Sequence, residues 1–246
     1  YMNNVKGLLS VVMPAYNEEA CIYKNLLETC DCVSTFCPTY EIILVNDGSP
    51  DHTFDEAMRA RAVNPHIKVA TYQVNRGKGG AIKEGISRAK GEYIAFLDAD
   101  LDLSPMHLQA FLEELLNEDA DIVIGSKLHK DSQLIYPLKR KIMSYGYYLL
   151  LHILFHLDLK DTQTGVKLFR AAVIKPIAQS LSTSGYAFDI EILARANQMG
   201  CRILEMPIHL EYRRGMENGT ARIRIGDVFS MFFDTLRIFW DIHFRS

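Results

Sequence analysis

Residues 92–102 read EYIAFLDADLD, an apolar run that ends in a pair of aspartates. The run Glu92–Leu97 has the length and apolar content of a buried strand. Asp98 and Asp100 follow it, and because residues two apart in an extended segment point the same way, both carboxylates can face one ligand. Two carboxylates at the carboxyl end of a strand suit a hard divalent cation, Mg²⁺ or Mn²⁺, that bridges a diphosphate. A capping or solvated-loop role is the alternative for an isolated Asp-x-Asp.

Similar apolar runs recur through the first half of the chain. Four more are predicted to be buried strands: Leu8–Met13, Glu41–Asn46, Ile67–Gln73 and Asp121–Gly125. Stretches of helical length lie between them, and the one after the aspartate pair is predicted to begin with Ser104 as N-cap and Pro105 at its first position. This alternation predicts an α/β fold with a mostly parallel central sheet and helices on both faces. Ligands of such sheets bind outside the carboxyl ends of the strands, which selects the loops after Met13, Asn46, Gln73 and Leu97.

The loop after the second strand reads NDGSPD (46–51). Gly48 permits a tight turn, and Asp47 offers an acceptor to a ring N–H of a nucleobase. A plain turn in which Asp51 caps the next helix is the other interpretation.

The loop after the third strand reads NRGKGG (75–80) and opens a helix. Its glycines let the backbone approach a phosphate, the helix N-terminus favours an anion, and Arg76 and Lys78 add positive charge. The loop matches neither the Walker pattern nor G-x-G-x-x-G, and solvated basic residues are the alternative. Base, phosphate and metal sites are thus predicted at neighbouring strand ends, and their convergence indicates a nucleotide-binding protein.

The composition restricts the class of protein further. With 246 residues and 48% hydrophobic content, the chain can form one large α/β domain or two small ones. A net charge of -3 argues against a surface shaped as a whole for nucleic acid, so no nucleic-acid partner is predicted. The five cysteines lack the spacing of a secreted disulfide framework or a zinc site, which favours reduced thiols in a cytosolic setting. No long apolar core precedes the first strand, so no signal peptide is expected.

Two long amphipathic segments point to a membrane surface. Pro137–Leu157 opens with the basic residues 139–141 and continues as an apolar, aromatic helix, which we expect at a lipid interface rather than in the core or across the bilayer. In Arg224–Phe244 a narrow polar stripe recurs at helical spacing, and the wide apolar remainder needs cover from protein or lipid. The stripe consists of Asp227, Ser230, Asp234, Arg237 and Asp241.

The chain resembles the family 2 glycosyltransferases with the GT-A fold in VVMPAYNEE (11–19), VNDGSPD (45–51), NRGKGGA (75–81) and FLDADLD (96–102). The second half looks like the polyprenyl-phosphate sugar transferases, which include dolichyl-phosphate mannose synthases and glucosyltransferases. The stretches that carry this are LKRKIMSYG (138–146), DTQTGVKLFR (161–170) and SGYAFDIEIL (184–193). The resemblance implies a single GT-A domain over 1–246, with a nucleotide-sugar half (1–125), an acceptor half (126–223) and an amphipathic C-terminal helix (224–246).

The resemblance also implies roles for particular residues. Asp100 would coordinate the metal, and Asp161, with Gln163 nearby, would lie beside the acceptor and the donor sugar. The nucleotide sugar would be bound by Pro14, Tyr16, Glu18, Asp47, Arg76, Lys78 and Asp98. The acceptor phosphate would be bound by Lys139, Arg140, Arg213 and Arg214.

The activity implied is inverting transfer of a hexose to a polyprenyl phosphate, with UDP-glucose favoured as donor and GDP-mannose the second choice. A phosphate acceptor is already anionic near pH 7 and needs little help from a base. A hydroxyl on a growing glycan is the alternative acceptor; it would need a base, for which Asp161 and Asp189 are the candidates. A sugar-nucleotide pyrophosphorylase and a catalytically silent lectin-like protein are the rival classes. We expect peripheral association with the cytoplasmic face of a membrane and leave a homo-oligomer open.

Overall fold

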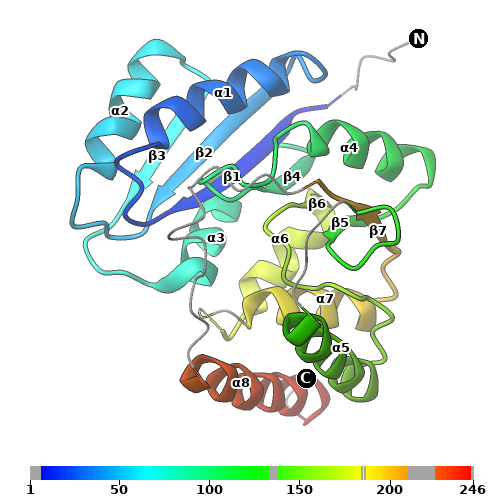
Figure 1. Cartoon of the computed structure of the whole chain (residues 1–246). Helices are drawn as coiled ribbons and strands as arrows, with labels where there is room; N and C mark the ends of the chain where they lie inside the picture. Colours follow the sequence, from blue (N-terminus) through cyan, green and yellow to red (C-terminus); the bar gives the residue numbers. More distant parts are fainter. Residues whose placement is uncertain (1–6, 133–137, 184, 186, 210–224, 245–246) are drawn as a thin grey trace.

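The protein is described here by a computed structural model that covers residues 7–132, 138–183, 185, 187–209 and 225–244. For residues 138–145 and 225–230 only the backbone is described. Strands and helices alternate through the first half of the chain, as the strand and helix patterns predict (Figure 1).

A single seven-stranded sheet forms the centre of the described structure, in the order β3-β2-β1-β4-β6-β5-β7. Every neighbouring pair is parallel except the two made by β6, which runs antiparallel between β4 and β5. The mostly parallel sheet predicted from the sequence is therefore confirmed. The strands are β1 (Leu9–Ala15), β2 (Tyr40–Asn46), β3 (Ile67–Thr71), β4 (Tyr93–Phe96), β5 (Ile122–Ser126), β6 (Lys167–Arg170) and β7 (Ile203–Pro207).

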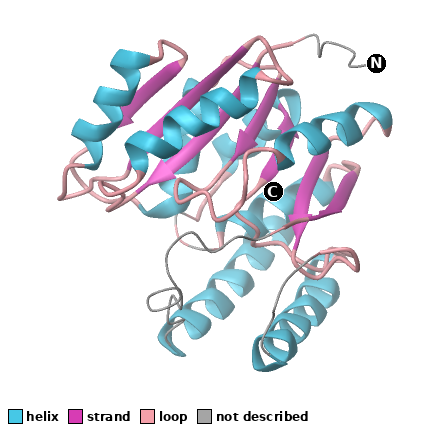
Figure 2. Cartoon of the chain, turned by 45° about the horizontal axis from the view of Figure 1, so that its top comes forward, coloured by secondary structure: helices cyan, strands magenta, loops and turns pink. Residues whose placement is uncertain are grey.

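Helices cover both faces of the sheet (Figures 1 and 2). Side chains alternate across β1, so Val12 joins one buried cluster, while Val11 and Met13 join the other. The first cluster packs the sheet against α3 (Gly77–Arg88), α5 (Leu138–Phe155), α6 (Ala171–Ser180), α7 (Phe188–Gln198) and α8 (Ile225–Phe244). The second packs it against α1 (Ile22–Ser34), α2 (Thr53–Val63) and α4 (His107–Asn117).

One predicted helix start is wrong. The helix after the aspartate pair begins at His107, not at Pro105. The Ser104 hydroxyl accepts a hydrogen bond from the Met106 backbone N at 3.3 Å, and the Ser104 carbonyl accepts one from the His107 backbone N at 3.1 Å. These bonds close a turn with Pro105 at its second position, where the fixed φ of proline favours a turn. Ser104 and Pro105 do mark the start of a local structure, but that structure is the turn before the helix.

The two amphipathic segments are helices, as predicted. The Pro137–Leu157 segment forms α5 and the Arg224–Phe244 segment forms α8. The helices lie side by side at the end of the molecule away from α1 and α2 (Figures 1 and 2), where the Tyr147 and Thr235 hydroxyls are hydrogen-bonded at 2.9 Å. Among the residues described, neither these helices nor any other is both long and apolar enough to cross a bilayer.

Candidate functional site

A cavity of about 720 Å³ lies at the carboxyl ends of β1, β2 and β4 and at the N-terminus of α3. All four loops selected from the sequence contribute to its wall, as the rule for parallel sheets predicts. It is lined by Pro14, Ala15, Tyr16, Glu18, Asp47, Asn75, Gly77, Lys78, Asp98, Ala99, Asp100 and Gly185.

Each of these loops contains a residue with left-handed backbone. Asn17 has φ 58°, Gly48 66°, Gly77 78° and Leu101 54°. At Leu101, directly after Asp100, this conformation costs about 1 kcal/mol or more, and the fully buried side chain holds it in place. At Gly48 a Cβ would lie 2.8 Å from the backbone N of Asn75, so only glycine fits where the second and third loops meet. Strain and close packing thus shape the cavity wall.

The first two loops are tied together by side chains of the α2 start. Thr53 Oγ1 accepts a hydrogen bond from the Glu18 backbone N at 2.8 Å, and Asp51 Oδ2 accepts one from the Glu19 backbone N at 3.2 Å. Asp51 Oδ1 also accepts from the Thr53 backbone N at 3.1 Å, but the N-cap of α2 is His52, so Asp51 does not cap the helix as the alternative expected. This residue therefore positions the loop after β1, and it does not line the cavity.

Asp47 is only 4% exposed but lines the cavity. Its Oδ1 accepts hydrogen bonds from the Tyr72 hydroxyl at 2.7 Å and the Arg76 backbone N at 2.8 Å. Arg76 itself does not line the cavity: its guanidinium stacks 4.2 Å above the Tyr72 ring. Burial and the Asp47 carboxylate both raise the pKa of Tyr72 above its ordinary range, which keeps it a proton donor. Tyr72 was not predicted as a site residue, because a single tyrosine after a strand carries no pattern.

Charged side chains form one ion pair at the cavity wall and a second in the core behind it. Lys78 Nζ lies 2.5 Å from Asp98 Oδ1 at the cavity wall, and Lys167 Nζ lies 2.7 Å from Asp189 Oδ1 behind it. Burial alone would lower the pKa of Lys78, but the charges of Asp98, Asp189 and Asp100 outweigh it and raise that pKa. Lys78 therefore stays positively charged at the start of α3.

The inner pair of this network is structural in character. Lys167 is 1% and Asp189 6% exposed, and Lys167 Nζ also donates to the Thr164 carbonyl at 2.5 Å. Burial raises the pKa of Asp189 more than Lys167 and Lys78 lower it. Neither residue lines the cavity, so Asp189, one of the two residues predicted as candidate bases, does not face it. Lys167 was not predicted, because a single lysine in a strand carries no pattern.

The aspartate pair is held by contacts on both sides. Asn25, buried in α1, donates a hydrogen bond from Nδ2 to the Ala99 carbonyl at 2.8 Å. Gly165 leaves room for the other side: a Cβ there would lie 2.0 Å from Asp98 Oδ2. Asp100 accepts a bond from the Asp102 backbone N at 3.2 Å. The residues described include no group of three or more His, Cys, Asp or Glu able to hold a metal unaided.

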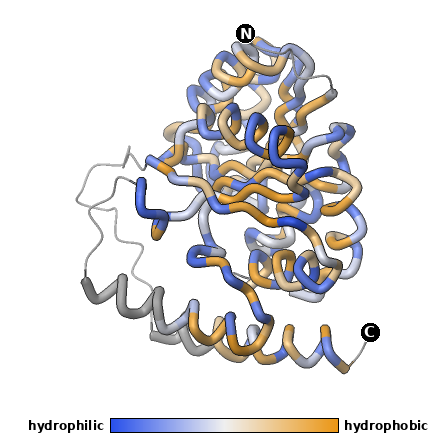
Figure 3. The backbone as a smooth tube through the Cα atoms, turned by 90° about the vertical axis from the view of Figure 1, so that its right-hand side faces the viewer, coloured by the Kyte–Doolittle hydropathy of each residue, from blue (hydrophilic) through white to orange (hydrophobic). Residues whose placement is uncertain are grey.

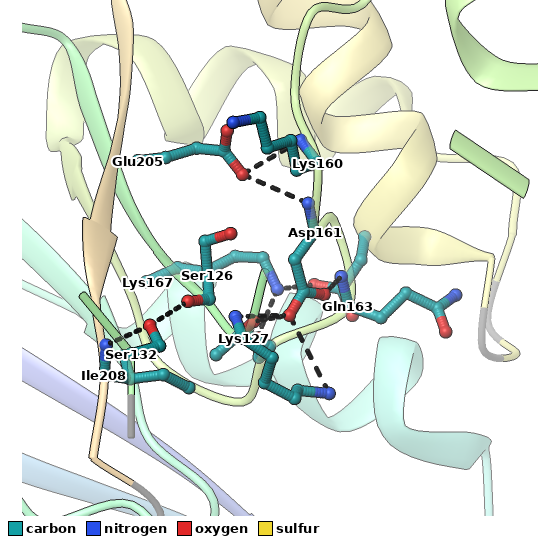
Figure 4. A network of polar contacts seen from close by, with 11 residues as sticks. Ser126, Lys127, Ser132, Lys160, Asp161, Gln163, Lys167, Glu205 and Ile208 are labelled. Atoms are coloured by element: carbon teal, nitrogen blue, oxygen red, sulfur yellow. Dashed lines mark hydrogen bonds and ion pairs between the residues drawn. The ribbon is translucent and has the colours of Figure 1, made fainter. Parts of the chain in front are cut away.

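Asp161 does not line the cavity but anchors the loop whose Gly165 lies against Asp98, and Figure 4 shows its hydrogen bonds. Its Oδ2 accepts hydrogen bonds from the Lys127 backbone N at 2.9 Å and Thr164 Oγ1 at 2.8 Å, and its Oδ1 from the Gln163 backbone N at 3.2 Å. Lys127 Nζ lies 3.9 Å away. The carboxylate thus joins the end of β5 to the turn before β6.

The neighbours of Asp161 extend this network to other elements. Glu205 of β7 accepts bonds from the backbone N of Lys160 at 2.9 Å and of Asp161 at 3.1 Å (Figure 4). The Gln163 amide points the other way and donates to Met231 Sδ on α8 at 3.1 Å. The predicted pair Asp161 and Gln163 therefore links the sheet to the C-terminal helix.

Glu191 organises the loop that brings Gly185 to the cavity. Its carboxylate is fully buried and accepts hydrogen bonds from the backbone N and hydroxyl groups of Ser182 and Thr183. Arg195, four residues on, pairs with it at 2.8 Å. Glu191 is therefore a buried partner of Arg195 and does not line the cavity.

Four predicted phosphate-binding residues have no described side chain. Lys139 and Arg140 belong to the first turn of α5, of which the backbone alone is described. Arg213 and Arg214 lie outside the described residues. Their proposed contact with phosphate stays a prediction.

Comparisons with known proteins show the family of the chain. The model of the family "Glycosyl transferase family 2" matches residues 10–177. The chain is 31% identical over 239 residues to the dolichyl-phosphate beta-glucosyltransferase ALG5A of Trichomonas vaginalis, covering 94% of this chain and 72% of that protein. It is 28% identical to the glycosyltransferase AglD of Haloferax volcanii, covering 96% of this chain and 38% of that protein.

Solved structures share the fold. Glucosyl-3-phosphoglycerate synthase of Mycobacterium tuberculosis, crystallised with Mn²⁺, UDP and glucosyl-3-phosphoglycerate, superposes with a TM-score of 0.68 at 19% identity, over 96% of this chain and 80% of that one. The sheet, its covering helices and the cavity at the strand ends define the class of α/β protein with the GT-A fold. This chain belongs to glycosyl transferase family 2. It spans 38% of the length of AglD and 66% of the dolichyl-phosphate beta-glucosyltransferase of Drosophila melanogaster, to which it is 34% identical over 81% of its own length.

Proposed function

We propose that the chain transfers a hexose, with inversion, from a nucleotide sugar to a polyprenyl phosphate at a membrane surface. The observation that carries the proposal is the grouping of Asp47, the α3 N-terminus and the aspartate pair around one cavity. These supply an acceptor for a base, an anion site for a diphosphate and oxygen ligands for a cation. The names of the dolichyl-phosphate beta-glucosyltransferases to which the chain is similar support the lipid acceptor.

The donor is proposed to lie along the strand ends. Asp47 would accept a base N–H, and Tyr16, 46% exposed at the cavity wall, offers a ring on which the base can stack. The diphosphate would lie at the α3 N-terminus beside Lys78, where the backbone N–H groups and the positive charge of Lys78 favour an anion. Pro14 and Glu18 line the same space. UDP-glucose is the favoured donor, and Mn²⁺ and UDP together in the similar M. tuberculosis structure support it.

A divalent cation, Mg²⁺ or Mn²⁺, fits the aspartate pair. Asp100 lines the cavity, and because Lys78 already neutralises Asp98, Asp100 is the carboxylate we assign to the metal. Mg²⁺ keeps several waters and takes one or two carboxylates plus substrate phosphates, which suits a site short of three protein ligands. A bound cation would neutralise charge on the departing diphosphate. The residues of the chain would orient the two substrates.

The acceptor side needs little proton transfer. A phosphate acceptor arrives as an anion, so no residue has to deprotonate it. This agrees with the surroundings of Asp161, whose carboxylate is already occupied by donors from Lys127, Gln163 and Thr164. We propose that Asp161 and Gln163 position the loop beside Asp98, and that Lys139, Arg140, Arg213 and Arg214 meet the acceptor phosphate.

A membrane surface would cover the apolar outer faces of α5 and α8. These faces, here the α5–α8 apolar face, hold seven of the fourteen large hydrophobic side chains that are exposed among the described residues. Figure 3 shows both helices at the base of the molecule, with much of their described length coloured hydrophobic. We propose peripheral binding at the cytoplasmic leaflet, which the five free cysteines support. The face consists of Leu149, Ile153, Phe232, Phe233, Leu236, Trp240 and Phe244.

The test is a donor and acceptor matrix. Purified protein with Mg²⁺ or Mn²⁺ is given UDP-glucose or GDP-mannose, with and without a polyprenyl phosphate in detergent, and release of the nucleoside diphosphate is measured. Release that requires both one donor and the lipid is the expected result. Release that instead requires a soluble oligosaccharide would replace the lipid with a glycan hydroxyl as acceptor. No release with any pair would overturn the proposal.

A further inference from the structure

The two carboxylate oxygens of Asp47 are not equivalent. Oδ1 accepts the Tyr72 hydroxyl at 2.7 Å and the Arg76 backbone N at 2.8 Å. A carboxylate oxygen has two lone pairs, so these donors saturate Oδ1. Within the described part of the chain, no hydrogen bond is made to Oδ2, and Asp47 lines the cavity. Oδ2 is therefore the one oxygen of this carboxylate that can accept a hydrogen bond from a ligand in the cavity.

The fold itself places Tyr72 at this oxygen. Asn46 and Thr71 are paired in the parallel register of β2 and β3, so the next residues, Asp47 and Tyr72, leave the sheet together. The Asn46 amide also donates to Thr71 Oγ1 at 3.0 Å, which locks the two strand ends. The Arg76 guanidinium over the Tyr72 ring holds the phenol in place from the other side.

Uracil and guanine present different donors to such a carboxylate. Uracil has one ring N–H between two carbonyl groups, which needs one acceptor oxygen. Guanine has a ring N–H beside an exocyclic amino group, and this pair of donors matches both oxygens of a free carboxylate. With Oδ1 saturated, one guanine donor stays unpaired in a buried site, and an unpaired buried donor is costly.

We infer that Tyr72 is a positioning residue that makes the donor site selective for uracil over guanine, by occupying the second acceptor oxygen of Asp47. The inference rests on the proposed function, since it assumes that the base of the donor meets Asp47. It chooses between the two donors that the sequence alone leaves open, in favour of a uridine nucleotide.

The experiment measures dissociation constants of UDP, GDP and IDP by calorimetry, in the presence of Mn²⁺. IDP separates the effect of the number of N–H groups on the base from the effect of the size of the base. Hypoxanthine has the purine ring N–H but lacks the amino group of guanine. Wild-type protein is expected to bind UDP best and IDP about tenfold more tightly than GDP, the effect of one unpaired donor. The Tyr72→Phe variant keeps the ring under Arg76 but frees one lone pair of Oδ1, so its preference for IDP over GDP and for UDP over GDP should each fall about tenfold.

Tyr40→Phe is the matched control, because Tyr40 is a buried tyrosine at the start of β2, at the end of that strand away from Asp47. Its nucleotide preferences should equal those of the wild type. Equal weakening of all three nucleotides in Tyr72→Phe would reduce Tyr72 to a structural residue and overturn the inference. Wild-type protein that binds GDP as tightly as UDP would overturn it too, while leaving the donor site in place. Binding of none of the three would overturn the proposed function itself.

Discussion

Replacing Gly165 with alanine tests whether the position of Asp98 sets the rate. The added Cβ would lie 2.0 Å from Asp98 Oδ2, whereas real Cβ contacts stay above 3.0 Å, so the carboxylate has to move by about 1 Å. Such a shift would break the 2.5 Å contact between Asp98 and Lys78. A displacement of about 1 Å at a reacting centre costs on the order of 100-fold in rate, and we expect kcat to fall by that factor.

The assay is release of UDP from UDP-glucose in the presence of the lipid acceptor, with UDP binding measured in parallel. Because Asp47 lies on a different loop, the dissociation constant of UDP should change by less than about threefold. Gly146→Ala is the control, since a Cβ on that exposed helical glycine meets nothing within 4 Å. A Gly165→Ala enzyme that is folded by circular dichroism and turns over within about threefold of the wild type would refute the argument.

Three further predictions concern the metal, the membrane face and acid stability. Asp100→Asn should lower metal-dependent turnover on the order of 100-fold while UDP-glucose still binds, and normal turnover across a Mn²⁺ titration would remove Asp100 from the metal site. Replacing Phe233 and Trp240 with serine should weaken binding to anionic vesicles at least about tenfold, since each buried aromatic contributes about 1.5–3 kcal/mol; unchanged co-sedimentation would show that another surface meets lipid. Glu191→Gln should destabilise the fold by about 2 kcal/mol at pH 7 in thermal denaturation. Burial alone would raise the pKa of Glu191, but bonds from Thr183, Ser182 and Arg195 lower it, so its stabilisation is present above the ordinary glutamate pKa and is lost as pH falls below it. The variant should therefore lose less stability than the wild type on acidification from pH 5 to pH 3, and an equal loss would contradict the assignment.

Much of the site was predictable because local patterns carried it. The apolar runs before Asp47 and Asp98 identified strands, and the glycine and charge pattern of residues 75–80 identified a helix start that lines the cavity. Parallel strands end at one edge of a sheet, so placing these motifs after strands was enough to bring them together. The start of α4 was mistaken because Ser104 and Pro105 are equally good signals for a turn.

The contacts between segments that are distant in the sequence could not be predicted from the sequence. Tyr72 meets Asp47 only because two strands share a register, and Lys167 meets Asp189 only because β6 enters the sheet antiparallel to its neighbours. Gly165 reads as an ordinary loop glycine until its distance to Asp98 is known.

The sequence by itself determined the α/β class, the four strand-end loops and the two amphipathic helices, since each depends on residues close together in the chain. Tertiary structure alone decided which oxygen of Asp47 is available, which cation neutralises Asp98, and that Asp161 secures a loop rather than lining the cavity. These properties depend on distances of about 3 Å between segments far apart in sequence, and hydrogen bonds and ion pairs act only at such distances.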